Sequence, residues 1–300
     1  MKYNTIKGYF FAIISAVIFG CMPLMAKHIY ADGVNSISLV FLRNLFSLLP
    51  LAILACKEQG TLKLPIKLMP SVSLIAILGC CATPILLFSS YNYMASGTAT
   101  IFHFIYPAVV VVSEIILLKS KPQLGNIISV ILCVTGICCF YSPGQPLSLT
   151  GSSLALLSGF TFAAYVILLA RFKKNSVSGF LLCFYVVAIS TAVSFLICIL
   201  TNSLTLPTSW LGWGLCILFS LLVSTGAVAL FQKSAFLIGS ERTSILSTLE
   251  PITGVVVGVI AFSEPLNPNT IFGSALVIAA SLLIAVVDIR NRNKTEVTDK

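Results

Sequence analysis

Charged residues are scarce in this chain. Only 9% of its 300 residues are charged and 58% are apolar, whereas soluble domains average about 25% charged and about 45–50% apolar residues. The mean hydropathy is +1.04. Apolar runs of about 20 residues recur throughout, each long enough to cross about 30 Å of hydrocarbon as a helix. The short alternating strands that a barrel needs are absent, so the sequence predicts an all-α integral membrane protein.

The chain also lacks the motifs of common membrane enzymes and pumps. It has no GxxxxGK[ST] loop to bind ATP, no HExxH motif to bind zinc and no Asp-x-x-Asp pair to hold magnesium around a diphosphate. Two histidines and no CxxC pair provide no donor set for a metal, and the ten cysteines lie in or beside apolar runs as small packing residues. We therefore expect no enzymatic activity, no cofactor and no metal site.

Positive charge exceeds negative charge, and the net charge is +9. The basic residues flank the apolar runs, so they indicate topology and not a nucleic-acid-binding surface. With the amino terminus inside, all eighteen lie on the inner side except Lys27, at the outer side, and Arg43, within the second helix. This predicts a multi-pass inner (plasma) membrane protein with both termini cytoplasmic. Its predicted partners are the lipid bilayer and a small-molecule substrate, and its oligomeric state stays open.

Ten transmembrane helices fit the apolar runs. We place them at 6–28, 36–56, 70–94, 98–118, 123–141, 151–171, 178–201, 210–236, 242–262 and 269–289. The connections between them are short and often contain proline or glycine. No connection is long enough to hold a soluble domain.

The two halves of the chain resemble each other at a spacing of about 144 residues. The recurring pairs include Gly8 with Gly151, Ser15 with Ser158, Phe19 with Phe162, Ser96 with Ser240 and Pro107 with Pro251. We therefore predict two five-helix repeats, 1–144 and 145–289, and a polar cytoplasmic tail, 290–300. Because five is odd, the second repeat enters the membrane from the opposite side. Such inverted repeats are common in transporters, which bind substrate at the midplane between the copies.

Two prolines, Pro107 and Pro251, stand at matching places in the fourth and ninth helices. A proline inside a helix removes a backbone hydrogen bond and frees the carbonyl of the residue four positions earlier, here His103 and Ser247. In a protein interior, such carbonyls can receive a ligand or a water. Glu250 lies beside the second proline, well inside the membrane, where ionisable groups usually face a cavity or a partner. We predict a substrate site that includes Glu250, Tyr106 and Ser247; the alternative for Glu250 is an ion pair with Arg43 or Lys233.

His103 and Glu114 extend this site along the fourth helix. They share one face with Pro107 and lie about 16 Å apart along the axis, so they can line one path at different depths. The alternatives are structural: a hydrogen bond near the outer interface for His103, and an ion pair with Lys119 for Glu114.

Other intramembrane residues have predicted roles in contact, packing or bending. Tyr91 and Tyr165 offer ring faces and hydroxyls to a substrate. Arg43 and Lys27 are predicted to be structural charges, Arg43 paired with an acid or a helix carboxyl end. The predicted kink and gating residues are Pro84, Pro107, Pro251, Gly254 and Gly258. Pro84 corresponds to Val228, so the halves are related but not interchangeable.

These segments together resemble ten-helix EamA-type transporters of the drug/metabolite transporter superfamily. The features that carry the resemblance are Ser15–Gly20 with Lys27, Phe41–Arg43, Ala95–Pro107, Gly239–Pro251 and Phe262–Leu266. The sequence departs from the family at Phe19, where tryptophan is common, and at Ser120, where an acid is common. The resemblance implies a central cavity lined by helices one, three, four, six, eight and nine, and movement of small metabolites such as amino acids, often outward.

We therefore expect a secondary or facilitative transporter that works by alternating access, most simply an exporter of amino acids or related metabolites. A sugar or nucleotide-sugar carrier is the alternative, followed by an exporter of cationic drugs. A nucleotide sugar would need several cations around its diphosphate, and the sequence offers Arg43, Lys27 and Lys233. A lipid-modifying enzyme and a receptor without transport activity are weaker rivals.

Overall fold

The computed structural model describes residues 2–118, 124–139, 148–172, 177–238, 243, 246–247, 249–263 and 267–298. Every regular element in these ranges is a helix. The first half contains α1 (Lys2–Gly20), α2 (Met22–Ala31), α3 (Ser36–Gln59), the short 3-10 turn η1 (Ile66–Leu68), α4 (Met69–Ala76), η2 (Ile77–Ala82), α5 (Thr83–Ser90), α6 (Ser96–His103), α7 (Tyr106–Leu118) and α8 (Leu124–Cys138).

The second half repeats this pattern. It contains α9 (Leu149–Arg171), α10 (Gly179–Leu200), α11 (Trp210–Phe219), η4 (Ser220–Ala227), α12 (Val228–Ile238), α14 (Leu249–Phe262) and α15 (Pro268–Thr298). Both η2 and η4 are π-helices, with wider turns than the α-helices that they interrupt.

Seven helical stretches of the described chain are long and apolar enough to cross a membrane. They are Thr5–Ala31, Ser36–Gln59, Ile66–Ser90, Ser96–Ser113, Leu149–Leu169, Gly179–Leu200 and Trp210–Phe231. Three further apolar helices are shorter: Leu124–Cys138, Leu249–Phe262 and Ile271–Ile284. The all-helical membrane architecture is thus confirmed, and the total of ten spans stays a prediction.

Two of the predicted helices are broken near a proline. The span predicted at 6–28 divides at Cys21 into α1 and α2, and Pro23 lies in the first turn of α2. The span predicted at 98–118 divides after His103, and α7 begins at Tyr106, one residue before Pro107. Each stretch still forms one candidate membrane span, Thr5–Ala31 and Ser96–Ser113, with its interruption beside the proline. A proline without an N–H group fits the first turn of a new helix better than a helix interior.

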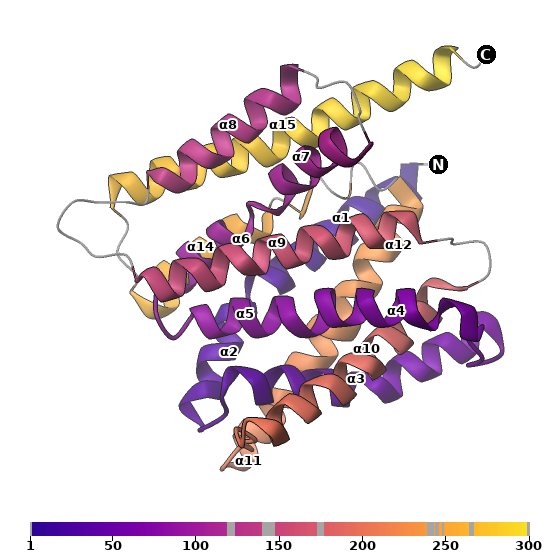
Figure 1. Cartoon of the computed structure of the whole chain (residues 1–300), viewed down its shortest axis with the longest axis vertical. Helices are drawn as coiled ribbons and strands as arrows, with labels where there is room; N and C mark the ends of the chain where they lie inside the picture. The colour runs from indigo at the N-terminus through magenta and orange to yellow at the C-terminus, as the bar shows by residue number, and fades with distance from the viewer. Residues whose placement is uncertain are drawn as a thin grey trace.

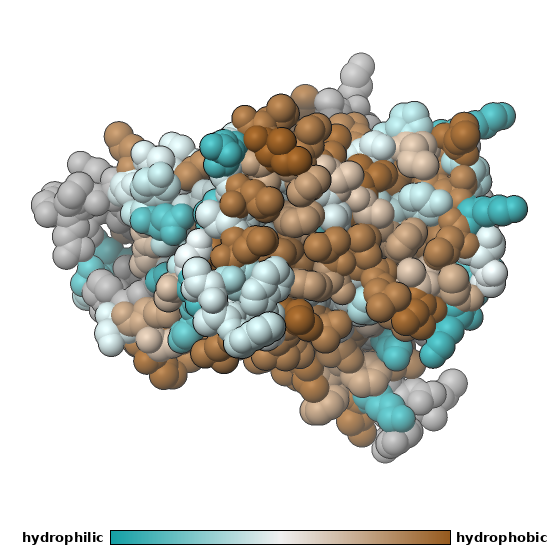
Figure 2. Space-filling model, turned by 90° about the horizontal axis from the view of Figure 1, so that it is seen from below, coloured by the Kyte–Doolittle hydropathy of each residue, from teal (hydrophilic) through white to brown (hydrophobic). Residues whose placement is uncertain are grey.

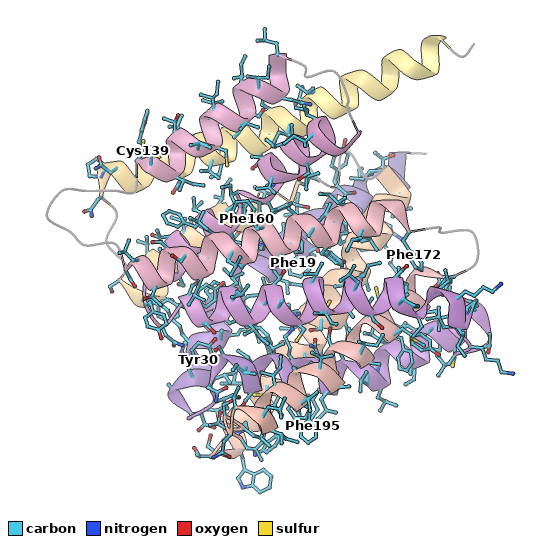
Figure 3. The ribbon with its side chains drawn as sticks, viewed as in Figure 1. Phe19, Tyr30, Cys139, Phe160, Phe172 and Phe195 are labelled. Carbon is cyan, nitrogen blue, oxygen red and sulfur yellow. The ribbon has the colours of Figure 1, made fainter. Side chains whose placement is uncertain are left out.

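The principal helix pairs each join one half of the chain to the other. α3 packs on α10, α8 on α15, α1 on α12, α5 on α9 and α6 on α14. Figure 1 shows α8 and α15 side by side along one edge of the bundle, and α3 with α10 toward the opposite edge. Figure 3 places Phe195 of α10 at that opposite edge, where its ring lies 5.1 Å from the ring of Phe41 on α3. Each half therefore completes the packing of the other.

Small hydroxyl side chains connect the halves inside the bundle. Ser15 donates to the carbonyl of Ala227 at 2.8 Å, and Ser190 donates to the carbonyl of Ala76 at 2.9 Å. The hydroxyls of Thr83 and Thr161 lie 2.8 Å apart. Such bonds fit a membrane interior, because small residues let helices approach closely and their hydroxyls hydrogen-bond across the contact.

The outer surface of the bundle suits a lipid environment. Figure 2 shows one face dominated by hydrophobic side chains, with most hydrophilic ones toward its two ends. Large apolar side chains are exposed on helices throughout the chain, including Ile53, Phe160, Leu196, Ile260 and Phe272. In water this exposure would be costly, whereas hydrocarbon solvates it well.

Asp32 joins the halves in the connection between α2 and α3. Its Oδ2 accepts hydrogen bonds from the backbone N–H groups of Thr208 at 3.0 Å and Ser209 at 3.2 Å, just before α11 begins. Hydrogen bonds from Ser209, and then from Thr208, hold the pKa of this carboxyl below its ordinary value. A Cβ on Gly212 would lie 1.8 Å from the same Oδ2, so glycine lets the carboxylate reach this helix start.

Replacing the carboxylate by Asp32→Asn should lower the melting temperature of the purified protein at neutral pH. Since the folded protein lowers the pKa, the stabilisation is present above the unfolded-state pKa of about 4 and is lost as the pH falls through the folded-state value. The difference in melting temperature between wild type and variant should therefore be largest near neutrality and close in acid. Thermal unfolding over a pH series measures this; a difference that stays constant down to roughly pH 3 would contradict it.

Candidate functional site

The strongest candidate site lies where α7 and α14 begin. Tyr106 and Glu250 precede the matched prolines and correspond to each other at the 144-residue spacing (106 + 144 = 250). Both side chains are half-buried. Tyr106 interacts electrostatically with Glu250. The structure therefore brings equivalent positions of the two halves together, with a phenol on one side and a carboxyl group on the other.

A row of aromatic rings leads from this pair into α9. The Tyr106 and Phe162 rings meet edge to face with centroids 4.8 Å apart, and Phe162 and Tyr165 are 5.3 Å apart. Tyr165 ends the row above η2: a Cβ on Gly79 would lie 2.2 Å from its ring. Edge-to-face ring pairs contribute about 0.5–1.5 kcal/mol beyond the area that they bury. The row is thus a stable wall built from both halves.

His103 faces the same wall and has a defined tautomer. Its ring centroid is 5.7 Å from that of Tyr106 and 5.3 Å from that of Phe162. Its Nδ1 lies 2.9 Å from Ser158 Oγ, and that hydroxyl donates to the carbonyl of Ala155 at 2.6 Å. A hydroxyl has one hydrogen, so Nδ1–H must be the donor to Ser158. The neutral ring therefore carries its lone pair on Nε2, as an acceptor.

The carbonyl freed by Pro107 contacts a glycine. A Cβ on Gly159 of α9 would lie 2.7 Å from the oxygen of His103 and 2.6 Å from Cγ2 of Ile105. Glycine allows this close approach between α6 and α9. The break in the fourth span is thus covered by the second half of the chain and not by lipid.

The end of α1 packs tightly against α14. A Cβ on Gly20 would lie 2.4 Å from Cβ of Thr253 and 2.8 Å from the carbonyl oxygen of Glu250. On α14, Gly254 is buried, and a Cβ there would make ordinary contacts with Thr100 of α6. Three helices therefore meet beside Glu250, and small residues set their spacing.

The two π-helices occupy equivalent places in the halves. Shifted by 144, Ile77–Ala82 falls on 221–226, inside Ser220–Ala227. In the first half, Pro84 frees the carbonyl of Cys80, which accepts a hydrogen bond from Nδ2 of Asn44 at 3.1 Å. π-Turns within α-helices are often found at functional sites. The only sequence signal of the π-helices was Pro84, which follows η2. The corresponding residue after η4 is Val228.

Arg43 has a different environment from the one predicted. Its Nε is buried without a hydrogen-bond partner. Its Cζ lies 5.6 Å from the ring centroid of Phe88, and its electrostatic neighbours are the thiols of Cys80 and Cys81. The acid or helix carboxyl end expected beside this cation is absent from these contacts.

The remaining candidates are spread through the bundle. Tyr91 is buried in the main core beside Phe88, with ring centroids 5.8 Å apart. Lys27 places its Nζ 4.1 Å from the ring centroid of Phe262. Ser247 is half-buried and donates to the carbonyl of Thr243 at 3.0 Å.

The predictions for Glu114, with its alternative partner Lys119, and for Ser120 fall on parts of the chain that are not described. The backbone of residue 114 belongs to α7, but the Glu114 side chain lies outside the described part, as do Lys119 and Ser120. Gly258 is described and buried in α14.

Comparisons with known proteins define the class. The model of the EamA-like transporter family matches the chain twice, at residues 6–142 and 149–286. The chain belongs to this family and is a membrane transporter. The family resemblance noted from the sequence is thereby confirmed. The double match accords with an internal repeat, while the boundary at 144 and the inverted arrangement stay predictions.

The relatives are themselves described only as transporters. An uncharacterized inner membrane transporter of Salmonella typhimurium, YicL, is 23% identical over 96% of this chain and 98% of its own length. YwfM of Bacillus subtilis, an uncharacterized transporter, is 25% identical over 72% of this chain and 73% of its own. The match to an uncharacterized transporter of Haemophilus influenzae, at 26% identity, spans 47% of this chain and 46% of the relative.

A solved structure shares the fold. It superposes with a TM-score of 0.65 over 97% of this chain and 99% of its own, at 16% sequence identity. At that identity, the similarity concerns the fold alone.

Gly20→Ala should destabilise the protein, because the added methyl group has no room between α1 and α14. Overpacking of this kind costs about 1–3 kcal/mol. The matched control is Gly214→Ala, where a Cβ meets nothing within 4 Å and the better helix propensity of alanine should leave stability unchanged or slightly raised. Thermal unfolding of both purified variants measures the difference. Equal shifts in the two melting temperatures would show that the contact with α14 is not tight.

Proposed function

We propose that this EamA-family protein is a secondary or facilitative transporter that exports amino acids or related metabolites across the inner membrane by alternating access. In this proposal, ten spans form two inverted five-helix repeats with both termini in the cytoplasm. The observation that supports it most is the meeting of Tyr106 and Glu250, equivalent residues of the two halves, at the starts of two helices.

The matched prolines and the equivalent π-helices suit a molecule that opens alternately to two sides. If the halves exchange conformations, each needs a flexible element in the same place. The structure has π-helices in the third and eighth spans, and helix starts beside Pro107 and Pro251. Hinges absorb backbone changes over a few residues at element ends. These positions would allow one half-span to move relative to the other without unfolding either.

The wall beside Tyr106 provides groups for a small polar metabolite. The Glu250 carboxylate would attract an ammonium group, and the Nε2 lone pair of His103 would accept a hydrogen bond from an N–H or O–H group. The rings of Phe162 and Tyr165 would pack against the apolar part of the molecule. Few polar groups set in an apolar wall are typical of small-molecule sites.

Counterflow in proteoliposomes tests the proposal directly. Vesicles loaded with unlabelled alanine should accumulate labelled alanine, and other amino acids should inhibit this exchange in a saturable manner. Running the assay at two pH values shows whether a proton takes part. If sugars, nucleotide sugars or organic cations inhibit the exchange and amino acids do not, the proposed substrate class is wrong and the inhibiting class takes its place. No exchange with any member of the panel would contradict transport of these classes.

Glu250→Gln should abolish substrate-induced thermal stabilisation and exchange while the variant still folds. The amide keeps the size of the side chain but removes the charge that attracts an ammonium group, and charged hydrogen bonds contribute about 1.5–3 kcal/mol. The matched control is Glu58→Gln: Glu58 is exposed at the end of α3, where its Oε2 accepts from the N–H of Phe180 at 3.2 Å. Unchanged ligand stabilisation in Glu250→Gln would remove Glu250 from the site.

A further inference from the structure

A second group of polar atoms lies on α3 and η4, and α3 is hydrogen-bonded to η2, on which Tyr165 of the aromatic wall packs. Four buried side-chain atoms without a hydrogen-bond partner come from two neighbouring elements: Arg43 Nε and Asn44 Oδ1 on α3, and Ser224 Oγ and Thr225 Oγ1 on η4. A buried polar group without a partner costs about 1–3 kcal/mol, and more if it is charged. Native structures contain few such groups, and each one calls for an explanation.

The two elements are joined at the level of Arg43. The hydroxyl of Ser220 donates to the carbonyl of Arg43 at 2.6 Å and lies 2.6 Å from the hydroxyl of Ser47. Ser224 and Thr225 follow one turn later in the same π-helix. Asn44 uses its Nδ2 on the carbonyl of Cys80, which leaves its Oδ1 without a donor. The unpartnered groups thus come from two elements, one in each half of the chain, that are hydrogen-bonded to each other.

The environment of Arg43 does not account for its charge. An arginine in the centre of a membrane helix costs about 2.5–3.5 kcal/mol on insertion scales and normally has a partner or faces water. Here the contacts are the ring of Phe88 and two thiols. A cation–π contact contributes about 0.5–2 kcal/mol and leaves the Nε–H donor unused. The side chain as a whole is half-buried, while its Nε is fully buried.

We propose that Arg43 binds the carboxylate of the transported metabolite, and that Ser224 and Thr225 supply further donors from the second half. This inference deepens the proposed function and rests on it. Guanidinium groups bind carboxylates through two parallel hydrogen bonds, which would use the free Nε–H. The Oδ1 of Asn44 provides an acceptor beside the anion, suited to an N–H or O–H group of the same molecule.

The available charge favours a single carboxylate over a phosphate or diphosphate. One guanidinium neutralises one negative charge, and more highly charged groups need further cations close by. Among the described residues, Lys27 has its Nζ above the Phe262 ring, and Lys233 is exposed. Neither of them is among the electrostatic neighbours of Arg43.

The test compares a carboxylate with the matching amide. Labelled alanine exchange is measured in wild type and in Arg43→Gln, with alanine and alaninamide as competitors. Wild type should prefer alanine by about tenfold or more, since a lost charged hydrogen bond changes affinity by at least that factor. Arg43→Gln should bind both competitors within about twofold. Arg43→Lys should keep part of the preference, because it retains the charge without the planar fork. Lys27→Gln, the matched control, should keep the wild-type preference.

For a variant that folds but does not exchange, the preference is measured as the rise in melting temperature of the purified protein with alanine and with alaninamide. Retention of the wild-type preference by Arg43→Gln in either assay would overturn the proposal. If Arg43→Gln does not fold, the variant Thr225→Val tests the proposal instead. Removing an unpartnered hydroxyl should leave the melting temperature without ligand unchanged or higher, while the concentration of alanine needed for half-maximal stabilisation rises severalfold. An unchanged alanine requirement would overturn the proposal.

A negative exchange result with the wild-type protein distinguishes failure of the proposed amino-acid transport from failure of the carboxylate site at Arg43. If wild type exchanges no amino acid, the proposed substrate class is wrong. Stabilisation of wild type by a simple monocarboxylate such as propionate, lost in Arg43→Gln, would then still support the anion site. Absence of that stabilisation would overturn the site as well.

Discussion

The fold depends on one constraint: within hydrocarbon, every backbone N–H and C=O group must find its partner inside the protein. In the described part of the chain, two breaks lie against a neighbouring helix. The carbonyl freed by Pro84 accepts from Asn44, and the carbonyl freed by Pro107 lies against Gly159. In both cases the covering residue comes from another helix. A transporter needs irregular backbone to move, and here that irregularity is confined to places that a neighbouring helix protects.

This constraint also explains why the halves are interleaved. The principal pairs, α3 with α10, α8 with α15, α1 with α12, α5 with α9 and α6 with α14, join one repeat to the other. The break at Pro84 is covered within the first half by Asn44, whereas the break at Pro107 is covered by Gly159 of the second half. Serines at equivalent positions serve this packing differently: Ser15 donates to a carbonyl of η4, whereas Ser158 positions the imidazole of His103. Matching positions of the two halves thus have different hydrogen-bond partners.

Local sequence properties predicted much of this structure. Long apolar runs predicted the helical membrane class, and the recurrence of Pro107 as Pro251 led to the prediction, which stays a prediction, that Tyr106 and Glu250 belong to one site. Patterns within the chain did not show what happens across helices. The π-helices differ from α-helices by one residue per turn, a difference that composition does not reveal. The lack of a partner for Arg43 Nε is a property of three-dimensional packing, which the sequence does not show, and Arg43 was predicted to be a structural charge.

The differences between the repeats are informative about the substrate. Arg43 corresponds to Val187, and Glu250 corresponds to Tyr106, so the cation comes from the first half and the acid from the second. Symmetric halves would present the same group from both sides and would suit a symmetric ligand. Opposite charges from opposite halves suit a ligand with a positive and a negative end. An amino acid has both ends, which accords with the proposed substrate class.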